Sequence, residues 1–230
     1  YNDFENFKEF IQKIESIKEP LPIFLVIDNG SISGDIKHFY ETHKDEKKLV
    51  WDFVKFEDNK GLGGAIKHST QFFEEDYIAW MPGNMKVDPM ECFNMVKTHK
   101  YSYLKLIKAR RIGRSFIDSL KTFIFSSIMS ARYNKILFDN GGTPNIMYKK
   151  LLDKVNFAPN DFSFDLFIFY FFKYKNLEIV RPKIFYKKRL HGNSHWQKGF
   201  VSEFILTKNM ILSKKSWIKN IKKADLKELE

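Results

Sequence analysis

Apolar and polar residues follow two different periods along the first half of the chain. Phe4, Phe7 and Ile11 are spaced three or four residues apart between polar side chains, which predicts an amphipathic helix over residues 3–17. The continuous apolar run over residues 23–27 predicts a short buried strand. The pattern then repeats, with helices expected over 35–43 and 64–75 and strands over 50–56 and 77–81.

Strands that alternate with helices are typical of an α/β fold with a mostly parallel sheet. Such sheets bind ligands beyond the carboxyl ends of their strands, and the polar loops 28–31, 59–61 and 82–84 all follow predicted strands. We therefore expect these loops to line one nucleotide site. Further along, the pattern predicts strands over 102–109 and 177–186, helices over 114–131 and 162–174, and a long basic helix from about residue 200.

Charge and composition limit the classes of partner. Lys and Arg outnumber Asp and Glu by 39 to 28, so the chain carries a net charge of +11 and favours polyanions: nucleic acid, an anionic membrane surface or phosphorylated small molecules. The single cysteine, Cys92, excludes an internal disulfide framework. No run approaches the ~18 consecutive apolar residues of a membrane-spanning helix, and the first residues show no secretory-signal pattern. We expect a cytoplasmic protein that forms a single domain over residues 1–230.

Six short motifs occur in a fixed order and together extend over almost the whole chain. They are Tyr1-Asn2-Asp3, Val26-Ile27-Asp28-Asn29-Gly30-Ser31, Asn59-Lys60-Gly61-Leu62-Gly63-Gly64-Ala65, Asp139-Asn140-Gly141-Gly142-Thr143-Pro144-Asn145, Phe164-Asp165-Leu166 and Arg189-Leu190-His191-Gly192-Asn193-Ser194. Any one of them is a weak signal. In this order they resemble the family 2 glycosyltransferases, particularly the dolichyl-phosphate mannose synthases and related polyprenyl-phosphate enzymes.

The resemblance implies a GT-A type, Rossmann-like α/β fold, with a mostly parallel central sheet flanked by helices and a C-terminal acceptor-side extension. Residues 1–99 would then bind a nucleotide sugar, and residues 100–230 would bind the acceptor and end in the basic helix. The implied reaction is inverting transfer of a hexose to a polyprenyl-phosphate or to a glycan hydroxyl in cell-envelope polysaccharide synthesis. The family opens with a hydrophobic strand before its Tyr-Asn-Glu motif, so we expect that strand to be missing before Tyr1.

The family's metal-binding Asp-x-Asp motif aligns with Pro82-Gly83-Asn84, so both carboxylates are absent. Two hypotheses remain open. Mg²⁺ or Mn²⁺ would bind weakly through Asn84, Asp88 and His191, although such cations prefer more carboxylate oxygens. Alternatively, the ammonium group of Lys86 would neutralise the donor diphosphate without a metal.

The resemblance also assigns roles to individual residues, each with a simpler structural alternative. Asp165 would be the general base, with Asp161 as second choice, and Asp139 would orient the donor sugar or the acceptor. The simpler alternatives are helix caps and turns for the aspartates and plain turn geometry for the glycines. The candidates for donor binding are Asp3, Asp28, Lys60, Gly61, Asn84, Lys86, Arg189 and His191.

Basic residues suggest where an acceptor and a membrane would lie. Arg110, Arg111 and Arg114 could hold the head group of a polyprenyl-phosphate, or form a solvated basic face. The segment from residue 200 mixes apolar residues with lysines, which fits either a helix on an anionic membrane surface or a helix packed on the domain. The first alternative would make the cytoplasmic protein peripheral on the inner face of the membrane, and the second would not.

Three other functions compete with this interpretation. A nucleotidyltransferase usually has a Gly-rich loop with a catalytic Lys or Arg after its first strand, which this chain does not show. A basic nucleic-acid-binding module is disfavoured because the aromatic residues cluster in apolar runs, so we expect no nucleic-acid partner. A degenerate, inactive transferase-like binding protein remains open because the Asp-x-Asp carboxylates are lost.

Overall fold

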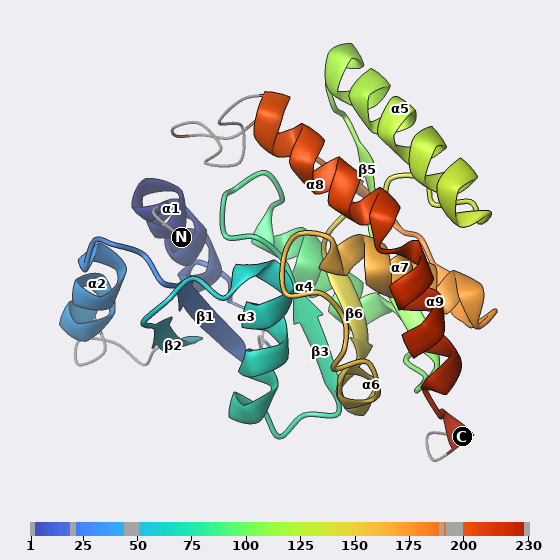
Figure 1. Ribbon diagram of the computed structural model, residues 1–230. Coiled ribbons are helices and arrows are strands. Elements are labelled where there is room, and N and C mark those ends of the chain that lie inside the picture. Colours follow the sequence, from blue (N-terminus) through green and yellow to red (C-terminus); the bar gives the residue numbers. More distant parts are fainter. Residues whose placement is uncertain (1–2, 19–21, 44–50, 189–190, 192–199, 228–230) are drawn as a thin grey trace.

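The computed structural model describes residues 3–18, 22–43, 51–188, 191 and 200–227 (Figure 1). In chain order its elements are α1 (Phe4–Glu15), β1 (Phe24–Asn29), α2 (Asp35–His43), β2 (Trp51–Phe56), α3 (Gly61–Ser69), the 3₁₀ turn η1 (Thr70–Phe72), β3 (Tyr77–Trp80), α4 (Pro89–Thr98), β4 (Lys105–Lys108), β5 (Arg110–Ile112), α5 (Phe116–Tyr133), β6 (Asn145–Tyr148), α6 (Lys149–Lys154), α7 (Phe164–Tyr174), β7 (Glu178–Val180), β8 (Lys183–Phe185), α8 (Phe200–Leu212) and α9 (Lys214–Lys223).

The N-terminal part is a parallel strand pair packed against helices, seen at the left of Figure 1. β1 and β2 run parallel, with Phe24 opposite Trp51. The apolar face of α1 packs onto them, and the rings of Phe7 and Trp51 meet edge to face with their centroids 5.7 Å apart. This packing holds the carboxyl ends of β1 and β2, and the polar loops that follow them, at one edge of the fold.

The central sheet has the strand order β3-β6-β4-β7. β6 runs antiparallel to both β3 and β4, whereas β4 and β7 are parallel. A separate parallel pair, β5 and β8, continues directly from β4 and β7 along the chain. The antiparallel β6 brings Asn145 between the ends of β3 and β4, pairing it with Trp80 on one side and Lys108 on the other.

α7 forms the centre of the largest core cluster. Residues 164–172 are all buried, because this helix is apolar on every side and is enclosed by the central sheet and by other helices. Its ring contacts include Phe167 with Trp217 of α9, at 5.2 Å between centroids. The first turn of α7 carries Asp165, a carboxylate at the edge of this apolar core.

The C-terminal helices differ in how they pack. α9 is held on the domain by Trp217 and Ile221, which are buried, while Lys219 and Lys222 face solvent. Of the two interpretations of the basic C-terminal helix, packing on the domain is correct for α9. α8 instead leaves several apolar side chains exposed. Within the described ranges, no helix is both long enough and apolar enough to cross a membrane.

The predicted α/β fold class is confirmed, and three of the five strand pairs among the described residues are parallel. Two predicted strands are each split: 102–109 becomes β4 and β5, and 177–186 becomes β7 and β8. The sequence pattern did not predict α4, β6 and α6. β6 is only four residues long and pairs with strands about 40 to 70 residues away, so local periodicity carries little sign of it.

Candidate active site

Asp165 lies where the central sheet meets the start of α7. The indole N–H of Trp80, at the end of β3, donates to its Oδ1 at 3.1 Å, and the amide of Asn145 donates to the same oxygen at 3.2 Å. The residue is only 7% exposed. Burial raises the pKa of this carboxyl, although Lys108, the Trp80 hydrogen bond and Arg111 oppose the shift. A carboxyl with a raised pKa is a stronger base than an exposed aspartate, which suits proton abstraction.

Lys108 is a fully buried cation next to this carboxylate. Its ammonium donates to the carbonyl of Gly142 at 2.9 Å and to Oδ1 of Asn145 at 3.0 Å, so Asn145 links the lysine to Asp165. Burial lowers the pKa of Lys108 to about 8, against the opposing pull of Asp165. In the sequence, Lys108 lies just before Arg110, Arg111 and Arg114, for which the alternatives were phosphate binding or a solvated basic face. Lys108 itself is buried and has neither of these roles.

We expect the Lys108→Met substitution to move the acid limb of the pH profile of kcat/KM to higher pH. Lys108 lowers the pKa of Asp165, so its removal raises that pKa further. A carboxylate base loses activity as pH falls through its pKa, and a higher pKa makes this loss begin at higher pH. Lys105→Met, the same change on the same strand, is the control. If Lys108→Met lowers kcat/KM at every pH but leaves the acid limb at the same pH, Lys108 does not control the pKa of Asp165.

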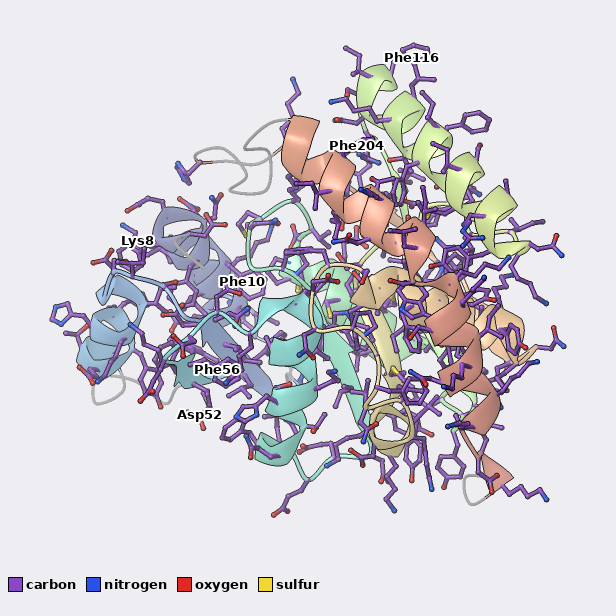
Figure 2. All side chains as sticks on the ribbon, in the orientation of Figure 1. Lys8, Phe10, Asp52, Phe56, Phe116 and Phe204 are labelled. Atoms are coloured by element: carbon purple, nitrogen blue, oxygen red, sulfur yellow. The ribbon has the colours of Figure 1, made fainter. Side chains whose placement is uncertain are left out.

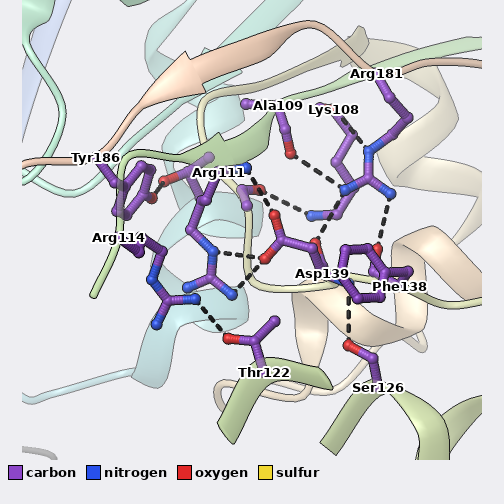
Figure 3. A network of polar contacts seen from close by, with 12 residues as sticks. Lys108, Ala109, Arg111, Arg114, Thr122, Ser126, Phe138, Asp139, Arg181 and Tyr186 are labelled. Carbon is purple, nitrogen blue, oxygen red and sulfur yellow. Dashed lines mark hydrogen bonds and ion pairs between the residues drawn. The ribbon is translucent and has the colours of Figure 1, made fainter. Parts of the chain in front are cut away.

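Asp139 and Arg111 form the second charged group of the site (Figure 3). The backbone N–H of Arg111 donates to Oδ2 of Asp139 at 2.7 Å, and its Nε donates to Oδ1 at 2.6 Å. Arg181 fixes the same turn by donating to the carbonyls of Phe138 and Asp139, both at 3.0 Å. Asp139 is 2% exposed and has a positive φ of 51°, so it is held in place by this network rather than by local preference.

The carboxyl end of β1 contains a buried carboxylate oxygen that lacks a hydrogen-bond partner. Oδ1 of Asp28 accepts the backbone N–H of Ser31 at 3.1 Å. Oδ2 is buried with no hydrogen bond, and the ammonium of Lys55 is 4.0 Å away. An unsatisfied buried oxygen costs free energy, which a ligand that donates a hydrogen bond would recover. The turn interpretation of Asp28 accounts for only one of its two oxygens.

Asn29 organises the neighbouring glycine loop. Its amide donates to the carbonyl of Gly61 at 3.1 Å, and its Oδ1 accepts the backbone N–H of Lys60 at 2.9 Å. The glycines allow other atoms to approach their backbone closely. The atoms that do so belong to another segment of the protein itself. A Cβ on Gly61 would lie 2.4 Å from the carbonyl oxygen of Asn160, and one on Gly63 would meet Phe164 at 2.7 Å. The loop is thereby packed beside the start of α7, next to Asp165.

The first and last motifs meet through Asn6, a residue that the sequence analysis did not single out. The Asn6 amide donates to Oδ1 of Asp3 at 2.7 Å and to the carbonyl of His191 at 2.8 Å. In return, the backbone N–H of His191 donates to Oδ1 of Asn6 at 3.1 Å. Asn6 is 1% exposed and lies on a helix face that is otherwise apolar. A polar residue at an apolar-face position of the helix is the sequence signal that could have identified it. Arg189 lies outside the described residues.

The three candidate metal ligands are each engaged elsewhere. Asp88 caps α4 through the backbone N–H of Met90 and forms ion pairs with Lys13 and Lys187. Burial raises its pKa, but these hydrogen bonds and charges outweigh that effect and lower it.

The other two candidates contact different groups. Oδ1 of Asn84 accepts the backbone N–H of Lys86 at 3.2 Å, and Nε2 of His191 lies 3.8 Å from Oε1 of Glu9. In the described part of the chain, no three His, Cys, Asp or Glu side chains form a group that could hold a metal ion. As these side chains lie, the donor set does not fit a divalent cation.

The remaining predicted residues occupy separate positions. Arg110 is exposed and lies over the ring of Phe138, at 5.4 Å from its centroid. Arg114 donates to the hydroxyl of Thr122 on α5. Asp161 accepts the backbone N–H of Ser163 at 2.8 Å, which agrees with its simpler role in the turn before α7. The structure therefore brings Asp165, Asp139 and Arg111 into one region and gives Asp161 a structural contact.

No protein-family model matches the chain, and a search of curated proteins finds no match. Solved structures do match. Glucosyl-3-phosphoglycerate synthase from Mycobacterium tuberculosis, in complex with Mn²⁺, UDP and glucosyl-3-phosphoglycerate, superposes with a TM-score of 0.66 at 13% identity, over 96% of this chain and 76% of that chain. A mannosyltransferase from Pyrobaculum calidifontis, in complex with GDP-Man and Mn²⁺, gives a TM-score of 0.57 at 14% identity, over 93% and 60% of the two chains. The chain has the GT-A glycosyltransferase fold.

Proposed function

We propose that this protein transfers a sugar from a nucleotide-sugar donor to an acceptor hydroxyl. The observation that carries the proposal is the position of Asp165, a buried carboxylate beside the glycine loop and linked through Asn145 and Lys108 to the turn that holds Asp139. Similarly folded proteins bind UDP and GDP-Man by their names, which supports a nucleotide-sugar donor. The proposed reaction transfers a hexose with inversion, in cell-envelope polysaccharide synthesis on the cytoplasmic side.

In the proposed reaction Asp165 takes the proton of the acceptor hydroxyl. The acceptor oxygen then bonds to the anomeric carbon while the bond from that carbon to the donor diphosphate breaks, which inverts the configuration. The nucleotide would be held by Asp28 and the loop at Lys60 and Gly61. Asp3 and His191, joined by Asn6, would close the donor side together with Arg189.

The charge of the leaving diphosphate is proposed to be balanced by lysines. Lys86 lies two residues after the position of the lost Asp-x-Asp, and its carbonyl accepts the backbone N–H of Lys187 at 2.8 Å. Lys187 and Lys13, which both form ion pairs with Asp88, also line a cavity of about 390 Å³ together with Glu9, Gln12 and Met85. Ammonium groups here would supply the positive charge that a cation supplies elsewhere.

For the acceptor we propose a molecule that carries both a hydroxyl and an anionic group, such as a polyprenyl-phosphate-linked glycan. A general base is needed only for a hydroxyl acceptor, and the arginines 110, 111 and 114 favour phosphate. A similarly folded protein is named in complex with phosphoglyceric acid, a small acceptor-like anion, which supports the same chemistry.

Donor binding is tested by thermal unfolding with UDP-, GDP-, dTDP- and CMP-sugars, each with and without Mg²⁺ or Mn²⁺. A ligand that binds only the folded protein raises its Tm. We expect one nucleotide class to stabilise the protein, and to do so equally in excess chelator. Stabilisation that requires the metal would overturn the role proposed for lysine, and no response to any donor would overturn the proposed activity.

The Asp28→Asn substitution is expected to weaken donor binding by roughly 10- to 100-fold, the value of a charge-assisted hydrogen bond. The amide keeps the oxygen that accepts from Ser31 and removes a buried carboxylate charge whose ion pair with Lys55 is long, at 4.0 Å. The ligand-free Tm should therefore not fall, while the donor-induced rise in Tm shrinks. Asp35→Asn, on the exposed start of α2, is the matched control and should behave as the unmodified protein.

A second candidate function is an inactive, transferase-like binding protein. The observation in its favour is the absence of carboxylates from the loop at Asn84, where the family carries Asp-x-Asp. Donor binding without turnover, with every acceptor class above, would favour it.

A further inference from the structure

Exposed apolar side chains of the described chain gather on two neighbouring helices, α5 and α8 (Figure 1). More than half of the exposed large apolar side chains are on these helices. We call this surface the apolar ridge. On α5 its members are between 44% and 82% exposed, and on α8 between 51% and 68%. The ridge consists of Phe116, Ile117, Leu120, Phe123, Ile124 and Ile128 of α5 and Phe204, Ile205 and Leu212 of α8.

The two helices are joined near their C-terminal ends. Nε of Arg132 donates to the carbonyl of Ile211 at 2.7 Å, and the hydroxyl of Tyr133 donates to the carbonyl of Met210 at 2.6 Å. The N-terminal end of α5 projects: residues 115–121 are all exposed. Figure 2 shows Phe116 at this projecting end and Phe204 near the start of α8. The ridge therefore faces outward, and only the N-terminal turns of α5 are uncovered on every side.

We propose that the apolar ridge inserts into the surface of an anionic lipid bilayer. Exposed apolar patches of this kind mark interaction sites, and a helix that lies in the interfacial layer of a bilayer is surrounded by lipid on more than one side. A second copy of the chain would cover one side of α5 and leave the rest of its apolar surface in water. The projecting, multi-sided exposure of α5 favours lipid as the occupant.

Charge gives the second argument. Lys121 and Lys208 are exposed within the ridge, and Lys215 and Lys219 continue along α9. The whole chain carries +11, which repels another copy of itself and attracts anionic head groups. Lysines next to apolar side chains can keep their ammonium groups at the level of the head groups while the apolar side chains enter the acyl boundary.

The ridge lies on the helix that also supports the Asp139–Arg111 pair. On the inner side of α5 the hydroxyl of Ser126 accepts the backbone N–H of Asp139 at 3.0 Å, and Thr122 contacts Arg114. A docked ridge would thus bring the acceptor-side residues close to the head groups, where a lipid-linked acceptor carries its phosphate. This last step rests on the proposed function, whereas lipid docking itself does not.

The test compares the full chain with the triple variant Phe116→Ser/Ile117→Ser/Phe123→Ser in flotation with vesicles. Phosphatidylcholine vesicles with and without phosphatidylglycerol are used at low and high salt. We expect the unmodified chain to float with the anionic vesicles and to be released by salt. The triple variant should bind at least about tenfold more weakly, because three large apolar side chains no longer enter the interface. Phe72→Ser, an exposed ring on η1, is the matched control and should bind normally.

Several outcomes would overturn the proposal. They are no flotation at low salt, equal flotation of the triple variant, or a dimer by light scattering that the triple variant converts to a monomer without any vesicle binding. The Tm of each variant shows whether it is folded, and exposed side chains should leave it unchanged. The donor-induced rise in Tm is measured in the same samples, so failure of donor binding is seen separately from failure of lipid docking.

Discussion

Replacing Asp165 by Asn is expected to lower kcat by about 100- to 10,000-fold, the usual contribution of a general base. The amide keeps the size of the side chain and one oxygen for the hydrogen bonds from Trp80 and Asn145. It cannot accept the proton of an acceptor hydroxyl. Donor binding should persist, because Asp165 is proposed to act on the acceptor, so the donor-induced rise in Tm is the internal check. Initial rates with a nucleotide sugar and a hydroxyl acceptor give kcat.

Asp161→Asn is the control for that experiment. Asp161 lies four residues earlier, in the turn before α7, and its carboxylate accepts the backbone N–H of Ser163. We expect a small effect on stability and little effect on kcat. If Asp161→Asn abolishes turnover and Asp165→Asn does not, the base has been assigned to the wrong carboxylate. If neither matters, the acceptor is itself a phosphate that needs no base.

The parts of the fold that could be predicted from sequence are those set by local patterns. Helix 162–174 was predicted within two residues at its start because its apolar run is long and continuous. α4 was missed although Asp88 and Pro89 form a strong helix start, because Asp88 was considered only as a candidate metal ligand. A motif alignment can thus hide an ordinary capping signal.

The parts of the site that could not be predicted depend on contacts between distant residues. Asp165 was found through its motif, but the sequence does not show that Trp80 and Asn145 would hydrogen-bond to it. β6 places Asn145 there by pairing antiparallel with two strands far away in sequence. Lys108 is similar: a lysine beside three arginines suggests a solvated basic face, and only the strand pairing shows that it is buried.

The pairing of Arg111 with Asp139 shows that a positively charged side chain near a site is not always available to bind a ligand. Before the structure, three arginines in five residues were equivalent candidates for phosphate. Arg111 uses its Nε and backbone N–H on Asp139, while Arg110 remains exposed. Arg111 therefore has a structural role whether or not it also contacts an acceptor, and the two roles need different measurements.

Replacing Arg111 by Met is expected to destabilise the protein by about 3–5 kcal/mol, because it leaves the buried Asp139 carboxylate without its cation. For a chain of this size the corresponding fall in Tm is roughly 6–20 °C.

Arg110→Met is the matched control, and an exposed arginine should change stability little. The double variant Arg111→Met/Asp139→Asn should recover part of the loss, since an amide is less costly to bury than an unpaired charge. If the double variant regains stability but its KM for the acceptor exceeds that of Asp139→Asn alone, the arginine contacts the acceptor as well. If Arg111→Met leaves Tm unchanged, the ion pair does not hold this turn in place, and the acceptor-side geometry proposed here fails with it.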